Sequence, residues 1–337
     1  MRQRWPFLII AFFLFSLTLL ASLSVGAKPV PFETVFLTFT SFDTNDYAHA
    51  IVWYQRWPRA LIAVYVGAVM ACAGCVLQGL TRNPLSSPTT LGINSGAAMF
   101  VVIASFVFGM NEQAQGYMAL AGALFGFFSC LLVVRLVGLS QDPRRLVLIL
   151  SGALIGMLYL SAANALLLSD PELRSNFLGW LTGNLNHAYA GRLFDYWWIG
   201  ASALALLFGL ARPLTLIVIG EEKAASAGVN VVFVCSLAFM AVAVSAGSAV
   251  AICGPLGFVG LIVPHIVRPF VGTSFIFSLP ACAVTGATAC LLADFVARFA
   301  FAPYVVHTGV ILDLVGGLVF AWIVKRYYLA RNAGSWT

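Results

Sequence analysis

Apolar runs of about twenty residues recur along this chain, and they constrain its fold more than any other feature of the sequence. Twenty residues in an α-helix span about 30 Å, which is the thickness of the hydrocarbon core of a bilayer. The runs do not alternate apolar and polar residues, so they indicate helices and not the strands of a membrane barrel. Charged residues make up 9% of the 337 residues, against about 25% in a soluble domain. We therefore predict an all-α integral membrane protein.

The apolar runs and the short segments between them predict about ten transmembrane helices. The expected spans cover residues 7–26, 60–80, 91–109, 117–137, 146–168, 196–211, 231–252, 256–271, 276–299 and 304–326. Arg2 and Arg4 precede the first run as in a signal peptide, but that run is longer than the usual apolar core of about 7–15 residues. We interpret it as a retained span. No linker interrupts the pattern, so residues 1–337 are expected to form a single transmembrane domain.

The basic residues are distributed unevenly between the two sides of the predicted spans. Twelve of the 18 lysines and arginines fall on one side: Arg2, Arg4, Arg82, Arg135, Arg144, Arg145, Arg212, Lys223, Arg268, Lys325, Arg326 and Arg331. Such an excess marks the cytoplasmic side, and an even number of spans places both termini there. On the outer side, the segment from about 169 to 195 contains Phe177-Leu-Gly-Trp180. These four residues are too few to span the membrane, which predicts a short interfacial or re-entrant helix.

Several kinds of chemistry are missing from the sequence. No lysine follows a glycine in a phosphate-binding G-x-x-x-x-G-K-[ST] loop, and the four histidines form no metal-binding or protease motif. The pair Cys72 and Cys75 has redox or metal spacing, but it lies within an apolar span and is interpreted as packing. We therefore predict no enzymatic activity, no metal and no cofactor in this chain. The net charge of +6 is attributed to orientation in the membrane and not to nucleic-acid binding.

Few ionisable residues lie within the predicted spans, and each is a candidate functional residue because charge in hydrocarbon is costly. Asp294 and Arg298 are spaced i and i+4, which places them on one face of a helix where they can pair. Asp313 lies within the last span. Two interpretations stay open for these acids: a structural hydrogen-bonded role, or proton coupling in a stand-alone secondary transporter.

Three stretches are rich in glycine, proline and polar residues at membrane depth. The first runs from Arg56-Trp-Pro-Arg59 through Asn83-Pro-Leu-Ser-Ser-Pro88 to Leu91-Gly-Ile-Asn-Ser-Gly96. The others are Gly220-Glu-Glu-Lys-Ala-Ala-Ser-Ala-Gly228 and Gly254-Pro-Leu-Gly-Phe-Val-Gly-Leu-Ile-Val-Pro-His-Ile-Val-Arg268. Together they resemble the FecCD family of ABC permeases, which import iron–siderophore complexes, haem and cobalamin. The first stretch is most similar to permeases for ferric citrate and ferric siderophores.

This resemblance implies a role for the chain and for particular residues. The chain would be a multi-pass inner-membrane permease subunit for an iron chelate, with haem or cobalamin as the alternative cargo. Its implied partners are two cytoplasmic ATPase subunits that hold the ATP and Mg²⁺, a periplasmic or lipoprotein binding protein, a second permease copy or a homologous permease, and membrane lipids. Docking of the binding protein is implied for Arg56, Arg59 and Arg298, whose planar guanidinium groups can bind carboxylates through two hydrogen bonds.

The resemblance also implies an inner contact and a pathway. The loop from about 213 to 230 would be the coupling segment against the ATPase, near which His265 is interpreted as a structural residue. The residues implied there are Glu221, Glu222, Lys223, Ala224, Ala225, Gly228, His265 and Arg268. The candidate residues of the translocation pathway are Ser161, Asn164 and Asp313.

Overall fold

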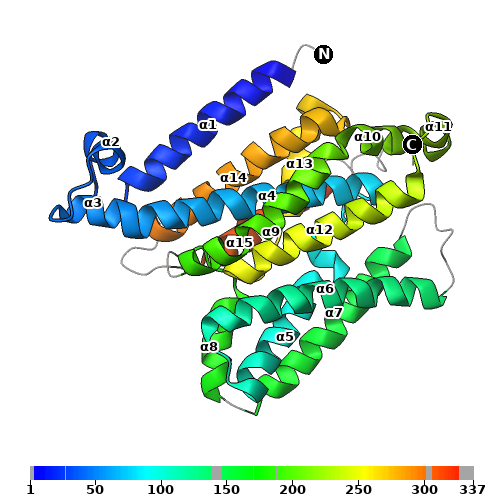
Figure 1. Ribbon diagram of the computed structural model, residues 1–337, viewed down its shortest axis with the longest axis horizontal. Coiled ribbons are helices and arrows are strands. Elements are labelled where there is room, and N and C mark those ends of the chain that lie inside the picture. The colour runs from blue at the N-terminus through cyan, green and yellow to red at the C-terminus, as the bar shows by residue number, and fades with distance from the viewer. Residues whose placement is uncertain are drawn as a thin grey trace.

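The computed structural model describes residues 4–26, 28–137, 146–169, 171–186, 189–300 and 306–325. All regular elements in these ranges are helices (Figure 1). They are α1 (Arg4–Ser24), α2 (Phe32–Thr40), α3 (Tyr47–Ile51), the π-helix η1 (Val52–Arg56), α4 (Trp57–Thr81), the 3₁₀-helix η2 (Pro88–Leu91), α5 (Ile93–Phe108), α6 (Glu112–Val137), α7 (Leu146–Leu167), α8 (Pro171–Leu181), α9 (Ala190–Gly209), α10 (Ala211–Ile219), α11 (Glu221–Ser226), α12 (Val231–Cys253), α13 (Val259–Val271), α14 (Phe275–Phe299) and α15 (Thr308–Val324).

Six helical stretches in the described part of the chain are long and apolar enough to cross a membrane. They are Arg4–Ser24, Tyr47–Thr81, Gln113–Leu136, Val147–Leu167, Val231–Cys253 and Phe275–Phe299. The pair α9 and α10 passes the same test as one stretch bent by 55°, and α5, α13 and most of α15 are shorter apolar helices. The prediction of a multi-pass helical membrane protein is thus confirmed, whereas the number of ten spans stays a prediction.

The second and sixth predicted spans differ most from the observed helices at their ends. The second was expected to begin at residue 60, but α3, η1 and α4 form one continuous helical stretch from Tyr47 to Thr81. The sixth was expected over 196–211, but α9 begins at Ala190 and the chain bends after Gly209. Pro213 explains this bend, because a proline near the start of α10 lacks the N–H group that would continue the hydrogen bonding of α9. Residues 304, 305 and 326 of the last predicted span lie outside the described ranges.

Helix α4 is the central element of the fold and packs against α14, α9, α12 and α13 (Figure 1). The approach is close where glycines face each other. A Cβ atom on Gly67 would collide with the carbonyl oxygen of Gly286 on α14, and one on Gly74 would collide with that of Gly260 on α13. Small residues allow backbones to pack this closely in a membrane, where packing replaces the hydrophobic effect between helices.

A second group of helices, α5, α6 and α7, packs together beside the first, and α12 joins the two groups through its contacts with α6 and α4. Figure 1 shows this second group with α8 at one end of it. The short helix that the sequence predicts near Phe177-Leu-Gly-Trp180 is α8, and its interfacial position stays a prediction. The end of α4 near α3 and the end near α11 lie on opposite sides of the molecule, which separates the two candidate sites.

Candidate functional site

An ion-pair network lies where the start of α4 meets the end of α14. The Asp294 carboxylate is fully buried, with its Oδ1 atom 2.6 Å from Arg59 Nε and its Oδ2 atom 3.0 Å from Arg298 Nε. The hydroxyl group of Thr308, at the start of α15, donates to Asp294 Oδ1 over 3.1 Å. The i, i+4 pair expected from the sequence is therefore present, and it gains a second arginine from a helix 235 residues away.

Two arginines of the same region also hold the end of α1. Arg56 Nη1 donates to the carbonyl oxygens of Leu23 at 2.7 Å and Ser24 at 2.8 Å. Arg298 Nη2 donates to Ser22 Oγ over 2.8 Å. The last carbonyl groups of a helix have no partner within that helix, so these guanidinium groups supply the missing donors. The arginines thus have a structural function within this chain.

The structure brings the three arginines predicted for docking into one place, and we call Arg56, Arg59, Asp294 and Arg298 the outer arginine cluster. The guanidinium group of Arg298 is close enough to repel those of Arg56 and Arg59. Three positive charges face one negative charge, and Arg59 Nη2 is buried without a hydrogen-bond partner among the described residues. Because Arg56 and Arg59 are themselves buried, their docking role stays a prediction.

The predicted coupling segment forms two short helices at the opposite end of the bundle. Helix α10 continues into α11 through Gly220, and Asn230 then caps the start of α12 by accepting from the Phe233 N–H over 3.1 Å. Gly228 adopts a φ of +83°, a conformation that glycine reaches without strain. The segment therefore has a regular structure, in which α10 and α11 lead from α9 to α12.

Helix α11 presents a polar surface around one buried anchor. Glu221, Glu222, Lys223, Ala225 and Gly228 are exposed, whereas Ala224 is buried. The carboxylate of Glu221 lies 4.0 Å from Arg82 Nη2 at the end of α4. Helix α10 is bound to the start of α14, where the Phe275 N–H donates to Thr215 Oγ1 over 3.0 Å.

His265 and Arg268 lie on α13, and the side chains of both contact backbone carbonyl groups of this chain. The Nδ1 atom of His265 is 2.8 Å from the carbonyl oxygen of Leu261, one helical turn earlier. Arg268 Nη2 donates to the carbonyl oxygen of Cys75 over 3.2 Å, and its side chain lines a cavity of about 230 Å³ together with Arg82. These contacts fit the structural interpretation of His265, and the contact of either residue with an ATPase stays a prediction.

The three pathway candidates are exposed on two helices of this chain. Ser161 and Asn164 lie on α7, and Asp313 lies on α15. A Cβ atom on Gly257 would collide with Asp313 Oδ1, so the carboxylate packs on this glycine. Both helices also expose large apolar side chains, among them Met157 on α7 and Leu318 on α15.

Comparison with known proteins identifies the family. The FecCD transport family matches residues 14–326, which is nearly the whole chain. This chain belongs to the FecCD transport family. The chain is accordingly an ABC transporter permease and a multi-pass protein of the inner membrane. Members of this family work with a separate ATPase and a substrate-binding protein.

Similarity to individual members of the FecCD family extends over almost the full length. The hemin transport system permease protein HmuU of Yersinia pestis is 35% identical over 97% of this chain and 98% of HmuU. The Fe(3+) dicitrate transport system permease protein FecD of Escherichia coli is 31% identical over 91% of this chain and 94% of FecD. A solved structure of a transporter assigned to the metal-chelate type of ABC transporter, in an inward-facing conformation, matches with a TM-score of 0.78 at 29% identity, over 95% and 98% of the two chains.

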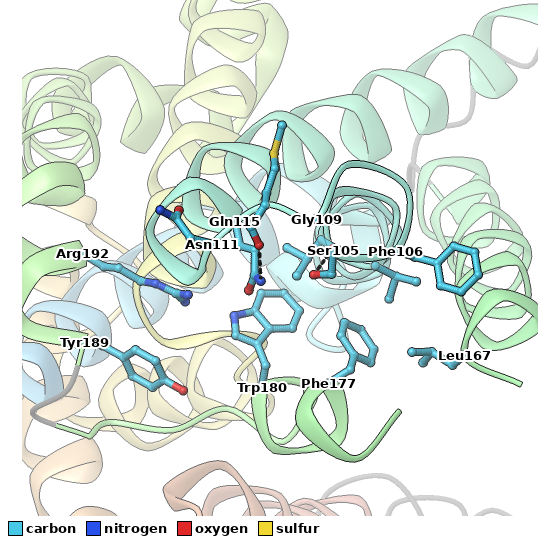
Figure 2. A pocket seen from close by; sticks show the side chains of 13 residues that line it. Ser105, Phe106, Gly109, Asn111, Gln115, Leu167, Phe177, Trp180, Tyr189 and Arg192 are labelled. Carbon is cyan, nitrogen blue, oxygen red and sulfur yellow. Dashed lines mark hydrogen bonds between the residues drawn. The ribbon is translucent and has the colours of Figure 1, made fainter. Parts of the chain in front are cut away.

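Sequence reasoning missed two features of this FecCD permease. It did not find the pairing of Arg59 with Asp294, because no local spacing relates residues on α4 and α14. It also missed a pocket of about 530 Å³ that contains Trp180 and Arg192 (Figure 2). The unusual FLGW segment and the single arginine at the start of α9 were visible in the sequence, but nothing there relates them. Among the described residues, no group of three or more His, Cys, Asp or Glu side chains is arranged to hold a metal ion.

Proposed function

We propose that this FecCD permease imports an iron chelate, either a ferric siderophore or ferric citrate, as the membrane subunit of a binding-protein-dependent ABC importer. The observation that carries the proposal is the full-length similarity to FecD and to YfiZ of Bacillus subtilis, a permease protein assigned to a siderophore transport system. YfiZ is 34% identical over 96% of this chain and 97% of its own length. Haem stays as the alternative cargo because HmuU is equally similar, and cobalamin stays open from the family resemblance.

The proposed arrangement crosses the membrane ten times and keeps both termini in the cytoplasm. It counts the six long helical stretches, the bent pair of α9 and α10, and the three shorter apolar helices α5, α13 and α15 as spans. The whole chain then forms one transmembrane domain, with residues of about 169–195 at the outer interface. The excess of basic residues on the side of Arg82, Lys223 and Arg268 supports this orientation.

At the outer end, the outer arginine cluster would receive an acidic group of the binding protein. Support comes from its excess of positive charge and from the spare N–H donors of Arg59. Arg298 is the more accessible of the two arginines paired with Asp294, with 16% of its side chain exposed against 9% for Arg59. Arg298 would therefore make the first contact.

At the inner end, α11 would fit into a groove of the ATPase. Its exposed charged residues surround small side chains that permit close approach, and the acids Glu221 and Glu222 lie at the start of the helix. Two ATPases and two permease copies would complete the importer. The pathway would run between the copies along α7 and α15, past Ser161, Asn164 and Asp313.

The stand-alone proton-coupled transporter is the less favoured alternative. Asp294 is one candidate for its coupling acid, but its carboxylate lies between two guanidinium groups and also accepts from Thr308. These contacts give Asp294 a structural role that joins α4, α14 and α15. Asp313 alone would have to carry the coupling.

Uptake of labelled substrates tests the proposal. In a strain that lacks this permease, we expect the plasmid-borne chain to restore uptake of labelled ferric siderophore or ferric citrate, and we expect no uptake when the partner ATPase is deleted. Haem and cobalamin serve as the comparison substrates in the same strain. Uptake of haem or cobalamin alone would refute the iron-chelate assignment, and uptake into liposomes by this chain without an ATPase would favour the secondary transporter.

A further inference from the structure

A pocket of about 530 Å³ lies between the ends of α5 and α7, the start of α6, helix α8 and the start of α9. Figure 2 shows that its lining is divided along its length. Arg192, Tyr189, Trp180, Asn111 and Gln115 gather at one end, and Phe106, Leu167 and Phe177 gather at the other. The volume lies within the usual range of about 300–1,000 Å³ for small-molecule sites.

The polar end of this pocket is rich in hydrogen-bond donors. Arg192 is 3% exposed and its guanidinium group lies 5.0 Å from the centre of the Tyr189 ring. Trp180 is 7% exposed, and its Nε1–H has no partner among the described residues. An indole N–H and a guanidinium group can only donate, and a guanidinium carries five N–H donors, so it can bind a further oxygen beside any contact it already makes. This end is suited to an oxyanion.

The apolar end of the pocket continues onto a surface that suits lipid. Phe106 is 39% exposed, and its neighbours Val107 and Phe108 at the end of α5 are exposed further. Leu167 lines the pocket and Leu168 beside it is exposed. A small ion such as free phosphate would fill only the polar end. A molecule with an anionic head and a hydrocarbon body would fill both ends.

We propose that this pocket binds an anionic phospholipid from the leaflet at this end of the helices. The phosphate group would accept from Arg192 and from Trp180 Nε1–H, and the acyl chains would lie along Phe177, Leu167 and Phe106. This inference does not depend on the cargo of the permease or on its partners. The proposal assigns a ligand to the space next to α8. Helix α8 lies between α7 and α15, the two helices that carry the candidate pathway residues: it contacts α7, and Thr182, directly after α8, packs on Gly309 of α15, where a Cβ atom would collide with the Thr182 carbonyl oxygen.

Native mass spectrometry of the full-length chain, purified in detergent and titrated with defined lipids, tests the site. We expect phosphatidylglycerol to bind at least about tenfold more tightly than phosphatidylcholine, because the net negative lipid matches the buried guanidinium. Trp180→Phe removes one donor and keeps an aromatic ring, so it should weaken phosphatidylglycerol binding about tenfold, as expected for a hydrogen bond to a charged group. Arg192→Gln should weaken it further.

Trp198→Phe is the matched control, since this exposed tryptophan on α9 donates only to the nearby carbonyl oxygen of Asp195 over 2.9 Å. Its affinity for phosphatidylglycerol should equal that of the unaltered chain. Equal affinity for the two lipids, or equal effects of the two tryptophan changes, would overturn the proposal. Inorganic phosphate that displaces phosphatidylglycerol at equal concentration would overturn the lipid assignment in favour of a free anion. If Arg192→Gln does not fold, Trp180→Phe decides the question alone.

Discussion

At the scale of single residues, Asp294 shows how a charged side chain is accommodated inside the helix bundle. Its carboxylate is completely buried and binds Arg59, Arg298 and Thr308, so it joins helices α4, α14 and α15. A buried ion pair adds little net stability by itself, because both charges lose their hydration. Removing one member is far more costly, since the remaining charge stays buried without compensation.

We therefore expect Asp294→Asn to destabilise the protein by about 3–5 kcal/mol, the usual cost of breaking a buried pair. Thermal unfolding of the purified chain in detergent measures this as a lower midpoint temperature. Asp195→Asn, at an exposed position on α9, should leave the midpoint nearly unchanged. A stable Asp294→Asn protein would show that the two arginines find other acceptors once the carboxylate is gone.

At the scale of helices, the sequence predicts some elements well and others poorly. Long uninterrupted apolar runs predict α7, α12 and α14 nearly to the residue. The extension of the second span back to Tyr47 was missed because Arg56, Pro58 and Arg59 interrupt the apolar pattern, and a proline between charged residues resembles the start of a helix. The bend after Gly209 depends on Pro213, whose effect on a neighbouring helix cannot be read from hydropathy. The outer arginine cluster depends on the packing of α4 against α14, which no local pattern encodes.

Helix α11 is the element whose function can be tested most directly. Replacing residues 221–226 with a Gly-Ser linker of equal length removes the exposed helix while α10 and α12 keep their own caps. We expect the variant to insert in the membrane normally but to lose its ATPase when the complex is purified, because the helix that we propose as the ATPase contact is gone.

The matched control replaces residues 41–46, between α2 and α3 at the other end of the molecule, with the same linker. That variant should retain the ATPase. Wild-type levels of ATPase with the altered α11 would remove the coupling role from this segment.

At the scale of the whole molecule, the exposed apolar surfaces differ in what they are expected to meet. Helix α1 packs on α14 along one side and exposes Ile9 and Phe13 on the other, as a helix at a lipid boundary does. Helix α15 exposes Leu314, Val315 and Leu318 next to the candidate pathway residue Asp313. Under the proposed function, this second surface faces the other permease copy.

Cysteine cross-linking distinguishes the two surfaces. The seven native cysteines are buried, so they should give little background. Leu318→Cys should form a disulfide-linked dimer in membranes under mild oxidation, because α15 would approach its counterpart at the pathway. Phe13→Cys, at a side chain that is 66% exposed against 67% for Leu318, should stay monomeric on a denaturing gel. Linkage through Phe13→Cys and not through Leu318→Cys would place the contact between copies elsewhere.

Helix α14 connects the two ends of the permease. Its first residue is hydrogen-bonded to Thr215 of α10, beside α11, and its last turns carry Asp294 and Arg298. At 1.5 Å per residue, its 25 residues measure about 37 Å, enough to cross the bilayer. Pro280 lies inside α14, yet the helix runs without a break between these two contacts. Under the proposed orientation, a displacement at the cytoplasmic end of α14 can therefore reach the opposite surface through one continuous helix, without passing along the proposed pathway.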